Sequence, residues 1–458
     1  MAESLVWLDA EYANQQSNQC AMLKRSNMER LTGIQGMHDV LPVTSVPAFR
    51  RSWNWERLYE SFSNLARRYG FCFIDTPEVE RLSLFVRSAG STSDIATKEM
   101  YSWYQGGREL CLRPEGSAAV ARALLESGLT RTEAVRVWYR MPMFRHERPQ
   151  FGRYRRHVQQ GAEIVGVESA SADVEIMRLL CDYYQATGLR GFSVRLNSIG
   201  DDACRGSYLQ RLTARLMETA DEYCADCRHR VATNPLRVFD CKMQADRDRS
   251  RSLPRVVDHL CDACVTHFEQ VQAGLKTVGV PYVLDPYLVR GIDYYTRTTF
   301  EVVLDEPIEQ MVTLTGGGRY DGLYEILGGV SVPAVGFGAG MERLLLALEH
   351  QGALSDRPPA PAVVIAVVDA ALQPEVLPLA TRLRDEGIST TFEHVPRRIG
   401  KQLAAASETG ARYAVILAPE EWASGDVLLK DLGANQQSRV RGSDLAVHIL
   451  RGLVRRSG

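Results

Sequence analysis

The sequence lacks several features that would place it outside an aqueous compartment. Nowhere do about 18 apolar residues follow one another, the length a membrane-spanning helix needs. Its first twenty residues, MAESLVWLDAEYANQQSNQC, have neither the basic start nor the apolar stretch of a secretory signal peptide. The 10 cysteines among 458 residues are typical of reduced thiols or metal ligands rather than of a disulfide framework. These absences predict a cytoplasmic protein without membrane contact.

Charge of one sign is also scarce. The 54 lysines and arginines are balanced by 56 aspartates and glutamates, which gives a net charge of -2. No overall basic field therefore attracts nucleic acid, and any RNA contact must come from local basic patches.

Two familiar nucleotide-binding motifs are missing as well. The stretch GGGRYDGL (316–323) has no G-K-[ST] ending, so it is not a P-loop. The stretch VGFGAGMERLLL (335–346) has Met341 where a dinucleotide-binding fingerprint requires its third glycine. What remains is a Gly-rich strand that enters a helix, with Glu342 and Arg343 in the first turn of that helix. Free backbone amides and an arginine at this place suit an anionic ligand.

The chain is too long for one ordinary core, and its patterns divide it into parts. Residues 352–362, GALSDRPPAPA, hold three prolines and predict a linker. A charge-rich, helical region with six cysteines interrupts the preceding core. The predicted parts are a flexible leader (1–32), the first part of a core (33–193), a helical insertion (194–285), the second part of the core (286–352), a linker (353–361) and a C-terminal domain (362–458).

Periodicity predicts an α/β (α+β) fold. Residues 49–70 have the spacing of an amphipathic helix, with Trp55, Leu58, Phe62 and Leu65 on one face. Beyond the linker, the strand-like runs AVVIAVV, STTFEHV, ARYAVILA and DVLLKDL accompany a helical region at 374–386. Such alternation predicts a small sheet that helices cover.

Charged side chains interrupt several predicted strands of the core. In ELCLRPEGS (109–117), alternation places Arg113 and Glu115 on one face and Leu110 and Leu112 on the other. The pair could present a carboxylate to an ammonium group, or could be an ordinary surface ion pair.

An arginine-rich segment follows at 138–157. Arginines bind phosphate oxygens in pairs of hydrogen bonds, and the interleaved aromatic residues can stack on bases, although a solvated basic loop is the alternative. Alternation predicts one strand face for Arg145 and Glu147. Its arginines are Arg140, Arg145, Arg148, Arg153, Arg155 and Arg156.

Two further segments place polar groups on strands. Gln159, Gly161 and Glu163 alternate and therefore share a face, which predicts the floor of a polar pocket. The segment LVRGIDYYTRTTFEVV (288–303) has many charged residues within an apolar pattern. Burying a charged side chain costs free energy, so these residues are expected to form ion pairs or to take part in a functional site. The polar residues of that segment include Arg290, Asp293, Tyr294, Tyr295 and Arg297.

These segments resemble the signatures of class II aminoacyl-tRNA synthetases. The arginine segment with FRHE (144–147) is similar to the second class signature, and VGFGAGMERLLL to the third. The segments RGIDYYTRTTFE (290–301), GGGRYDGL and GMHDVLP (36–42) resemble the histidine branch of the class. The resemblance extends from about residue 33 to the C-terminal end.

The resemblance implies a largely antiparallel sheet flanked by helices, a helical insertion and a C-terminal α/β anticodon-binding domain. It also implies a homodimer, whose interface lies near Pro77. The expected reaction joins L-histidine to tRNA(His) through histidyl-adenylate, with ATP and Mg²⁺. Two alternative functions are a regulatory relative from histidine biosynthesis, which is expected to lack the C-terminal domain, and a tRNA-binding protein without catalysis. A synthetase for another amino acid is disfavoured by RGIDYY.

Site residues follow from the same resemblance. Catalysis is assigned to Arg145 and Arg290, and no residue is assigned to a catalytic metal. ATP binding is assigned to Arg145, Glu147, Arg153 and Arg343. Histidine binding is assigned to Glu115, Gly116, Ser117, Gln159, Glu163, Arg290, Tyr294 and Tyr295. The chain departs from the family in having His157 and Val158 where an aromatic pair or an aromatic–histidine pair is usual, and Ser117 where threonine is frequent.

Cysteine spacing adds a separate hypothesis, a structural zinc in the insertion. Cys224 and Cys227 form one C-x-x-C pair, Cys261 and Cys264 form another, and Cys241 lies between them. Zinc favours four thiolates in a tetrahedron, which two such pairs can supply. The 33 residues between the pairs exceed the ~15–20 of simple zinc ribbons. The alternative is that these cysteines are small buried hydrophobes.

Overall fold

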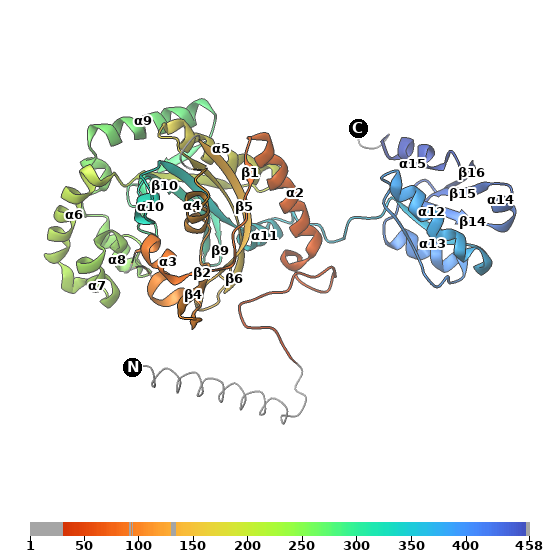
Figure 1. Ribbon diagram of the computed structural model, residues 1–458, viewed down its shortest axis with the longest axis horizontal. Coiled ribbons are helices and arrows are strands. Elements are labelled where there is room, and N and C mark those ends of the chain that lie inside the picture. The colour runs from red at the N-terminus through yellow and green to blue at the C-terminus, as the bar shows by residue number, and fades with distance from the viewer. Residues whose placement is uncertain (1–30, 91–92, 94, 130–133, 455–458) are drawn as a thin grey trace, which may run out of the picture. The chain divides into compact units, whose positions relative to one another are not determined.

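The computed structural model describes residues 31–90, 93, 95–129 and 134–454, so most of the predicted leader lies outside it. Its contacts form two compact units, residues 1–354 and 355–458. The first unit is built on an eight-stranded sheet that is antiparallel except where β1 and β8 join it (Figure 1). Across the sheet the strands are β1 (Cys72–Phe73), β5 (Val135–Phe144), β6 (Arg156–Val165), β11 (Ala334–Gly340), β10 (Met311–Arg319), β9 (Thr296–Ile308), β7 (Phe192–Ser198) and β8 (Tyr282–Leu284).

One face of this sheet is apolar and covered by helices. Trp55, Leu58, Phe62 and Leu65 are buried there, as the helical period predicts, although the α-helix begins at Ser52 rather than at residue 49. Apolar residues of β6, β9, β10 and β11 complete this core, whose burial is the main favourable term for the fold. The covering helices are α2 (Ser52–Arg68), α5 (Ala170–Thr187), α9 (Asp262–Thr277) and α11 (Met341–His350), preceded by the short turn η1 (Ala48–Arg50).

The opposite face carries a second hydrophobic core, which includes Val137, Tyr139, Met141 and Met143 of β5. A small antiparallel sheet in the order β2 (Val79–Arg81), β4 (Arg108–Leu112), β3 (Ser102–Gln105) precedes helix α4 (Ser117–Glu126) in the chain. The insertion contributes the green helices of Figure 1. The helical elements not yet named are α3 (Leu82–Ala89), η2 (Ile95–Glu99), α6 (Asp202–Met217), η4 (Ala220–Glu222), α7 (Ala225–Thr233), η5 (Pro235–Val238), α8 (Gln244–Ser250), η6 (Val256–His259) and α10 (Leu323–Ile326).

The second unit is a five-stranded sheet with its own hydrophobic core. Its strand order is β13-β12-β14-β15-β16, and the predicted strands and the helix at 374–386 are confirmed. The elements are β12 (Val363–Val367), η7 (Ala370–Leu372), α12 (Gln373–Asp385), β13 (Thr390–Phe392), α13 (Ile399–Glu408), β14 (Tyr413–Leu417), α14 (Pro419–Ala423), β15 (Asp426–Asp431), β16 (Gln436–Arg441) and α15 (Leu445–Val454). In neither unit do the described residues form a helix that is both long and apolar enough to cross a bilayer.

Candidate active site

The polar face of the large sheet is lined by a row of glycines. Strand register aligns Tyr139 of β5 with Gly161, then Gly338, then Gly316. Gln159 and Glu163 lie on the same face as Gly161, as alternation predicts, because Ala162 between them belongs to the apolar core. The Gly-rich strands therefore form a floor for side chains from neighbouring elements.

Side chains of other residues fill the space above Gly316, Gly336 and Gly338. A Cβ at Gly336 would collide with the carboxylate of Glu163, and one at Gly338 would collide with the amide of Gln159. A Cβ at Gly316 would overlap the guanidinium of Arg290 in the same way. Gly316, Gly336 and Gly338 therefore allow polar side chains to pack closely on the sheet, and they do not form a phosphate-binding loop.

Two buried carboxylates lie beside the first turn of α4. Glu115 accepts hydrogen bonds from the backbone N–H groups of Ser117 (2.7 Å) and Ala118 (2.9 Å). Glu163 accepts from the Ser117 hydroxyl (Oγ–Oε1 2.7 Å) and from Tyr320. Burial raises the pKa of Glu163 to about 8 and also raises the pKa of Glu115. The pocket thus holds carboxyl groups whose ionisation a cationic or hydrogen-bonding ligand can stabilise.

Three tyrosine rings form one wall of this pocket. The ring centroid of Tyr294 lies 4.9 Å from that of Tyr295 and 5.4 Å from that of Tyr320. The Tyr294 hydroxyl donates to Glu115 at 3.4 Å. Burial raises the pKa of Tyr295 to about 12, so its hydroxyl remains a hydrogen-bond donor at neutral pH. Tyr320 was missed from the sequence, although it adjoins the glycine run GGGR.

Arg290 lies on the glycine floor and forms an ion pair with Glu301. Thr313 donates to the second oxygen of Glu301 at 3.0 Å. Among the described residues, neither Arg290 Nε nor Gln159 Oε1 has a hydrogen-bond partner, and both atoms are buried. Buried polar atoms without partners are costly, so one donor and one acceptor are available here to a ligand.

A second group of cations lies close by. Arg343 donates to the carbonyls of Thr313 (2.6 Å) and Gly152 (2.9 Å), which fixes its guanidinium. Burial, Arg153 and Arg145 together lower the pKa of Arg343 to about 10, so the side chain stays charged at neutral pH. Such a concentration of positive charge suits a polyphosphate.

The remaining members of this group are held by local contacts. Arg145 donates to the carbonyl of Pro114 at 3.0 Å, and Arg153 lies 3.6 Å from Glu147. Burial and the adjacent Arg145 and Arg343 lower the pKa of His157 to about 3, so this imidazole adds no charge. His157 and Val158, the departure from the family pattern, occupy paired positions on β6 beside Met143 and Pro142.

Several strand expectations are wrong in detail. The strand of 109–117 ends at Leu112, and Cys111 rather than its two leucine neighbours is fully buried. Arg113 is completely buried and donates to the carbonyls of Thr76 and Pro142. Its ion-pair partners are Asp75 (3.8 Å) and Glu78 (3.6 Å), so it does not form the predicted pair with Glu115. Its guanidinium holds the loop before α4 in place.

The other two deviations concern strand ends. Strand β5 ends at Phe144, so Arg145 and Glu147 belong to a loop. Strand β9 begins only at Thr296, so Arg290 and the two tyrosines precede it. Unlike Gln159 and Glu163 of β6, these polar residues lie on segments between strands, where successive side chains need not alternate between two faces.

An antiparallel sheet with helices on its apolar face, and with carboxylates and arginines on its glycine-lined face, defines the catalytic domain of a class II aminoacyl-tRNA synthetase. The family profile described as "Histidyl-tRNA synthetase" matches residues 36–344, and that described as "Anticodon binding domain" matches residues 362–451. The chain belongs to the histidyl-tRNA synthetase family.

Individual relatives agree with this assignment. The histidine–tRNA ligase of Anaeromyxobacter sp. is 41% identical over 92% of this chain and 99% of its own, and that of Thermotoga sp. is 42% identical over 85% and 92%. The apo histidyl-tRNA synthetase of S. aureus superposes with a TM-score of 0.76 and 31% identity over 92% of this chain and 99% of that one. A Bacillus halodurans protein described as an ATP phosphoribosyltransferase regulatory subunit/histidyl-tRNA synthetase shares the fold, with 20% identity and a TM-score of 0.60 over 86% of this chain.

Proposed function

We propose that this chain is a histidine–tRNA ligase: it activates L-histidine with ATP and transfers the histidyl group to tRNA(His). The observation that carries the proposal is the glycine floor. Family membership gives the reaction class, and the floor brings Gln159, Glu163 and Arg290 together beside a cluster of arginines. An amino-acid pocket thus adjoins a phosphate site on one face of one sheet.

Histidine would occupy the carboxylate pocket. Its ammonium group would lie by Glu115 and the free Oε1 of Gln159, with Ser117 adjacent and Gly116 leaving room beside Tyr139. The imidazole nitrogens would face Glu163 and Tyr295, with Tyr294 along the ring. Because these polar groups are buried, an amino acid that left them unpaired would be rejected by ~10⁴–10⁵.

ATP would bind along the arginine cluster as its Mg²⁺ complex. Arg145 and Arg343 would hold its phosphates, with Glu147 and Arg153 orienting that end of the site. Arg290 would approach the α-phosphate as the histidine carboxylate attacks, since negative charge accumulates there in the transition state. The products are histidyl-adenylate and pyrophosphate. A terminal hydroxyl of the tRNA then attacks the carbonyl carbon of the adenylate, which forms histidyl-tRNA and releases AMP. No covalent enzyme intermediate is required.

The C-terminal unit supplies the means of selecting the tRNA. Arg397, Arg398 and Lys401 form an exposed basic patch at the start of α13, within the region that matches anticodon-binding domains. Basic groups on such a surface bind the RNA backbone. The working assembly we propose is a cytoplasmic homodimer with its interface around Pro77, as the family resemblance implies.

ATP–pyrophosphate exchange, measured separately with each amino acid, tests the activation step. Exchange with histidine alone is expected. Exchange with a different amino acid would refute the assigned substrate. No exchange at all, from folded protein that binds histidine, would favour the regulatory alternative from histidine biosynthesis.

A further inference from the structure

The helical insertion gathers its cysteines into two compact groups. The first consists of Asp201, Cys204, Cys261 and Cys264, and the second of Cys224, Cys227, Cys241 and Asp246. Within each group the possible ligand atoms all lie within 4.8 Å of one another, and none of these cysteines is in a disulfide. The two C-x-x-C pairs therefore do not converge on one site, contrary to the zinc-ribbon spacing considered from the sequence.

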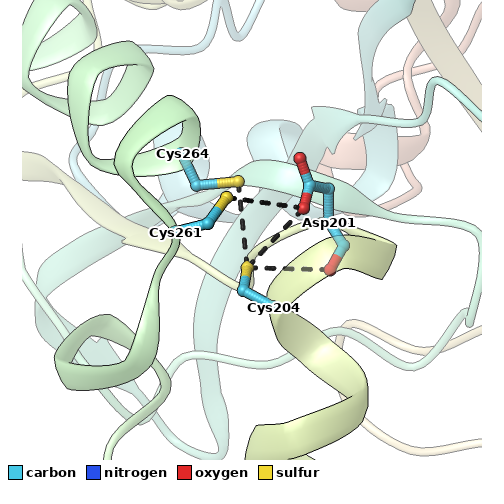
Figure 2. Close-up of side chains that lie close together, drawn as sticks. All are labelled: Asp201, Cys204, Cys261 and Cys264. Atoms are coloured by element: carbon cyan, nitrogen blue, oxygen red, sulfur yellow. Dashed lines mark hydrogen bonds between the residues drawn. The ribbon is translucent and has the colours of Figure 1, made fainter.

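We propose that each group binds one zinc ion through three thiolates and one carboxylate oxygen, giving two structural zinc sites per chain. The proposal does not depend on the proposed function. In each group, one C-x-x-C pair is completed by a cysteine and an aspartate from elsewhere in the insertion. Figure 2 shows the first group, with the Cys204, Cys261 and Cys264 sulfurs turned toward the Asp201 carboxylate.

The distances between the cysteine sulfurs match those between thiolates bound to one zinc ion. Two thiolates bound to one tetrahedral zinc, with Zn–S bonds of about 2.3 Å, stand about 3.8 Å apart. The Sγ atoms of Cys204 and Cys264 are 3.9 Å apart, and those of Cys224 and Cys241 are 3.8 Å apart. Four protein ligands also fill the coordination sphere of zinc, which makes the sites structural rather than catalytic.

Other occupants fit less well. A disulfide needs sulfurs about 2.05 Å apart, so the thiols of each group are not placed for oxidation without movement. The cysteines of an iron–sulfur cluster are divided among two or more irons, so as a set they spread farther apart than the ligands of a single ion, whereas the ligand atoms of each group here all lie within 4.8 Å of one another. Calcium and magnesium prefer oxygen ligands, and each group offers a single carboxylate.

Neighbouring groups already orient the ligands of the second site. The backbone N–H of Cys227 donates to Cys224 Sγ at 3.5 Å, and that of Met243 donates to Cys241 Sγ at 3.3 Å. Asp246, which is only 3% exposed, receives the N–H of Cys224 at 3.1 Å and lies 3.4 Å from Arg249. Such contacts fix the geometry of the ligands.

Asp201 is held in the same manner in the first site. Its Oδ1 faces Cys204 (3.6 Å) and Cys261 (3.8 Å), while Arg297 lies 3.4 Å from its Oδ2. The backbone N–H of Ala203 also donates to Oδ1 at 3.1 Å. One carboxylate oxygen is therefore directed at the sulfurs, and the other is fixed by an arginine.

The first site joins both ends of the insertion to the candidate active site. Asp201 and Cys204 lie at the start of α6, whereas Cys261 and Cys264 lie at the start of α9. Arg297 belongs to β9 and exchanges backbone hydrogen bonds with residues 199 and 200 (2.8 and 2.7 Å). Arg205 of α6 donates to the carbonyl of Tyr295 at 2.6 Å. Zinc here would hold the insertion against the segment that carries the tyrosines of the pocket.

Elemental analysis of the full chain, purified without added metal, tests the proposal. We expect two zinc ions per chain. Cys204→Ser and Cys241→Ser should each remove one, whereas Cys181→Ser, a buried cysteine on α5 outside both groups, should keep both. Chelator should lower the melting temperature of the parent chain, because metal binding is coupled to folding. Cobalt replacement should give the absorption of a tetrahedral thiolate complex.

Three results would contradict the proposal, and metal analysis distinguishes them. Less than about 0.2 zinc per chain, with melting unchanged by chelator, would overturn the proposal, since a structural zinc contributes folding free energy. Iron with acid-labile sulfide would overturn it as well, and one zinc per chain would refute the two-site form. If a serine variant does not fold, the metal content of the parent chain and of Asp201→Cys, which preserves four ligands, still decides the matter.

Discussion

Arg290 and Glu301 form an ion pair on the glycine-lined face of the sheet, eleven positions apart in the chain. Glu301 stands on β9, and Arg290 lies before that strand begins, so the pair turns the guanidinium back over Gly316. The carboxylate keeps the pKa of Arg290 raised despite burial, so the cation is present before a substrate arrives. A charge that is already oriented costs little to reorganise during reaction.

Removing this cation should nearly abolish adenylate formation. We expect Arg290→Ala to lower ATP–pyrophosphate exchange by about 10²–10³, the usual effect of deleting one preorganised donor, while tRNA binding in a filter assay is retained. Arg195→Ala is the matched control, because Arg195 pairs with Glu301 in strand register but is exposed and lies 3.5 Å from Asp285. Exchange within about tenfold of the parent, a barrier change near 1.4 kcal/mol, would rule out the assigned role of Arg290.

Adding a methyl group to a glycine of the floor should displace the side chain that packs on it. Gly338→Ala should raise the KM for histidine by about tenfold or more, equivalent to about 1.4 kcal/mol, because its methyl group displaces the Gln159 amide. Gly340→Ala, two residues further along, is the control, since its Cβ would make only ordinary contacts at 3.9 Å with Arg343. Steady-state exchange kinetics and melting curves of both variants provide the measurement. Equal histidine KM values in the two variants would contradict the pocket assignment.

Buried Glu342 predicts a pH dependence of stability. Burial raises its pKa to about 8, and the Val158 N–H lies 3.0 Å from both carboxylate oxygens. The folded chain therefore retains a proton that the unfolded chain releases above its ordinary pKa of about 4.5. Stability from this group is complete at low pH and is lost as pH rises from about 4.5 to 8, by a few kcal/mol at about 1.4 kcal/mol per pKa unit.

Glu342→Gln tests this dependence because the amide cannot ionise. The melting temperature of the variant, relative to the parent, should rise between pH 5 and pH 8. Glu269→Gln, which alters an exposed carboxylate on α9, should leave the difference from the parent flat. Parallel melting profiles for parent and Glu342→Gln across this range would show that Glu342 does not titrate as stated.

Because each of the two units has its own hydrophobic core, we expect histidine activation to survive removal of the C-terminal unit, whereas tRNA charging should not. Deleting residues 358–458 should leave histidine-dependent exchange measurable, because the carboxylate pocket and the arginine cluster lie wholly in the first unit. Charging of tRNA should fall at least about 100-fold in kcat/KM, equivalent to about 2.7 kcal/mol. In the full chain, Arg398→Ala with Lys401→Ala should reduce charging and leave exchange unchanged. A folded truncation that charged tRNA as well as the full chain would refute this division.

Several features of the fold could be predicted from the local pattern of apolar and polar residues. The helical period placed the buried face of α2, and alternation placed Gln159 and Glu163 together on β6. The junction of β11 with α11 at Gly340 and Met341 also followed from the Gly-rich run and the helix after it. Hydrophobic period is a property of neighbouring residues, so it survives without knowledge of what packs where.

The positions at which strands end could not be predicted from the sequence. Alternation extended the strands through Arg113, Arg145 and Arg290, but backbone pairing stops at Leu112 and Phe144 and starts again only at Thr296. A strand ends where its backbone pairing with a neighbouring strand stops, and that limit depends on the neighbour as well as on the strand itself. Periodicity within a segment holds no information about that limit.

The sequence by itself determined the reaction class, through signatures such as RGIDYY, and the faces that local period assigns. Only the tertiary structure brought Tyr320 to Glu163, placed Arg290 over Gly316, and added Asp201 and Asp246 to the two groups of cysteines. The physical reason is that these contacts depend on strand register and helix packing between segments far apart in the chain. Cysteine spacing shows which thiols are adjacent along the chain, whereas the approach of the first turns of α6 and α9 brings Cys204 beside Cys261 and Cys264.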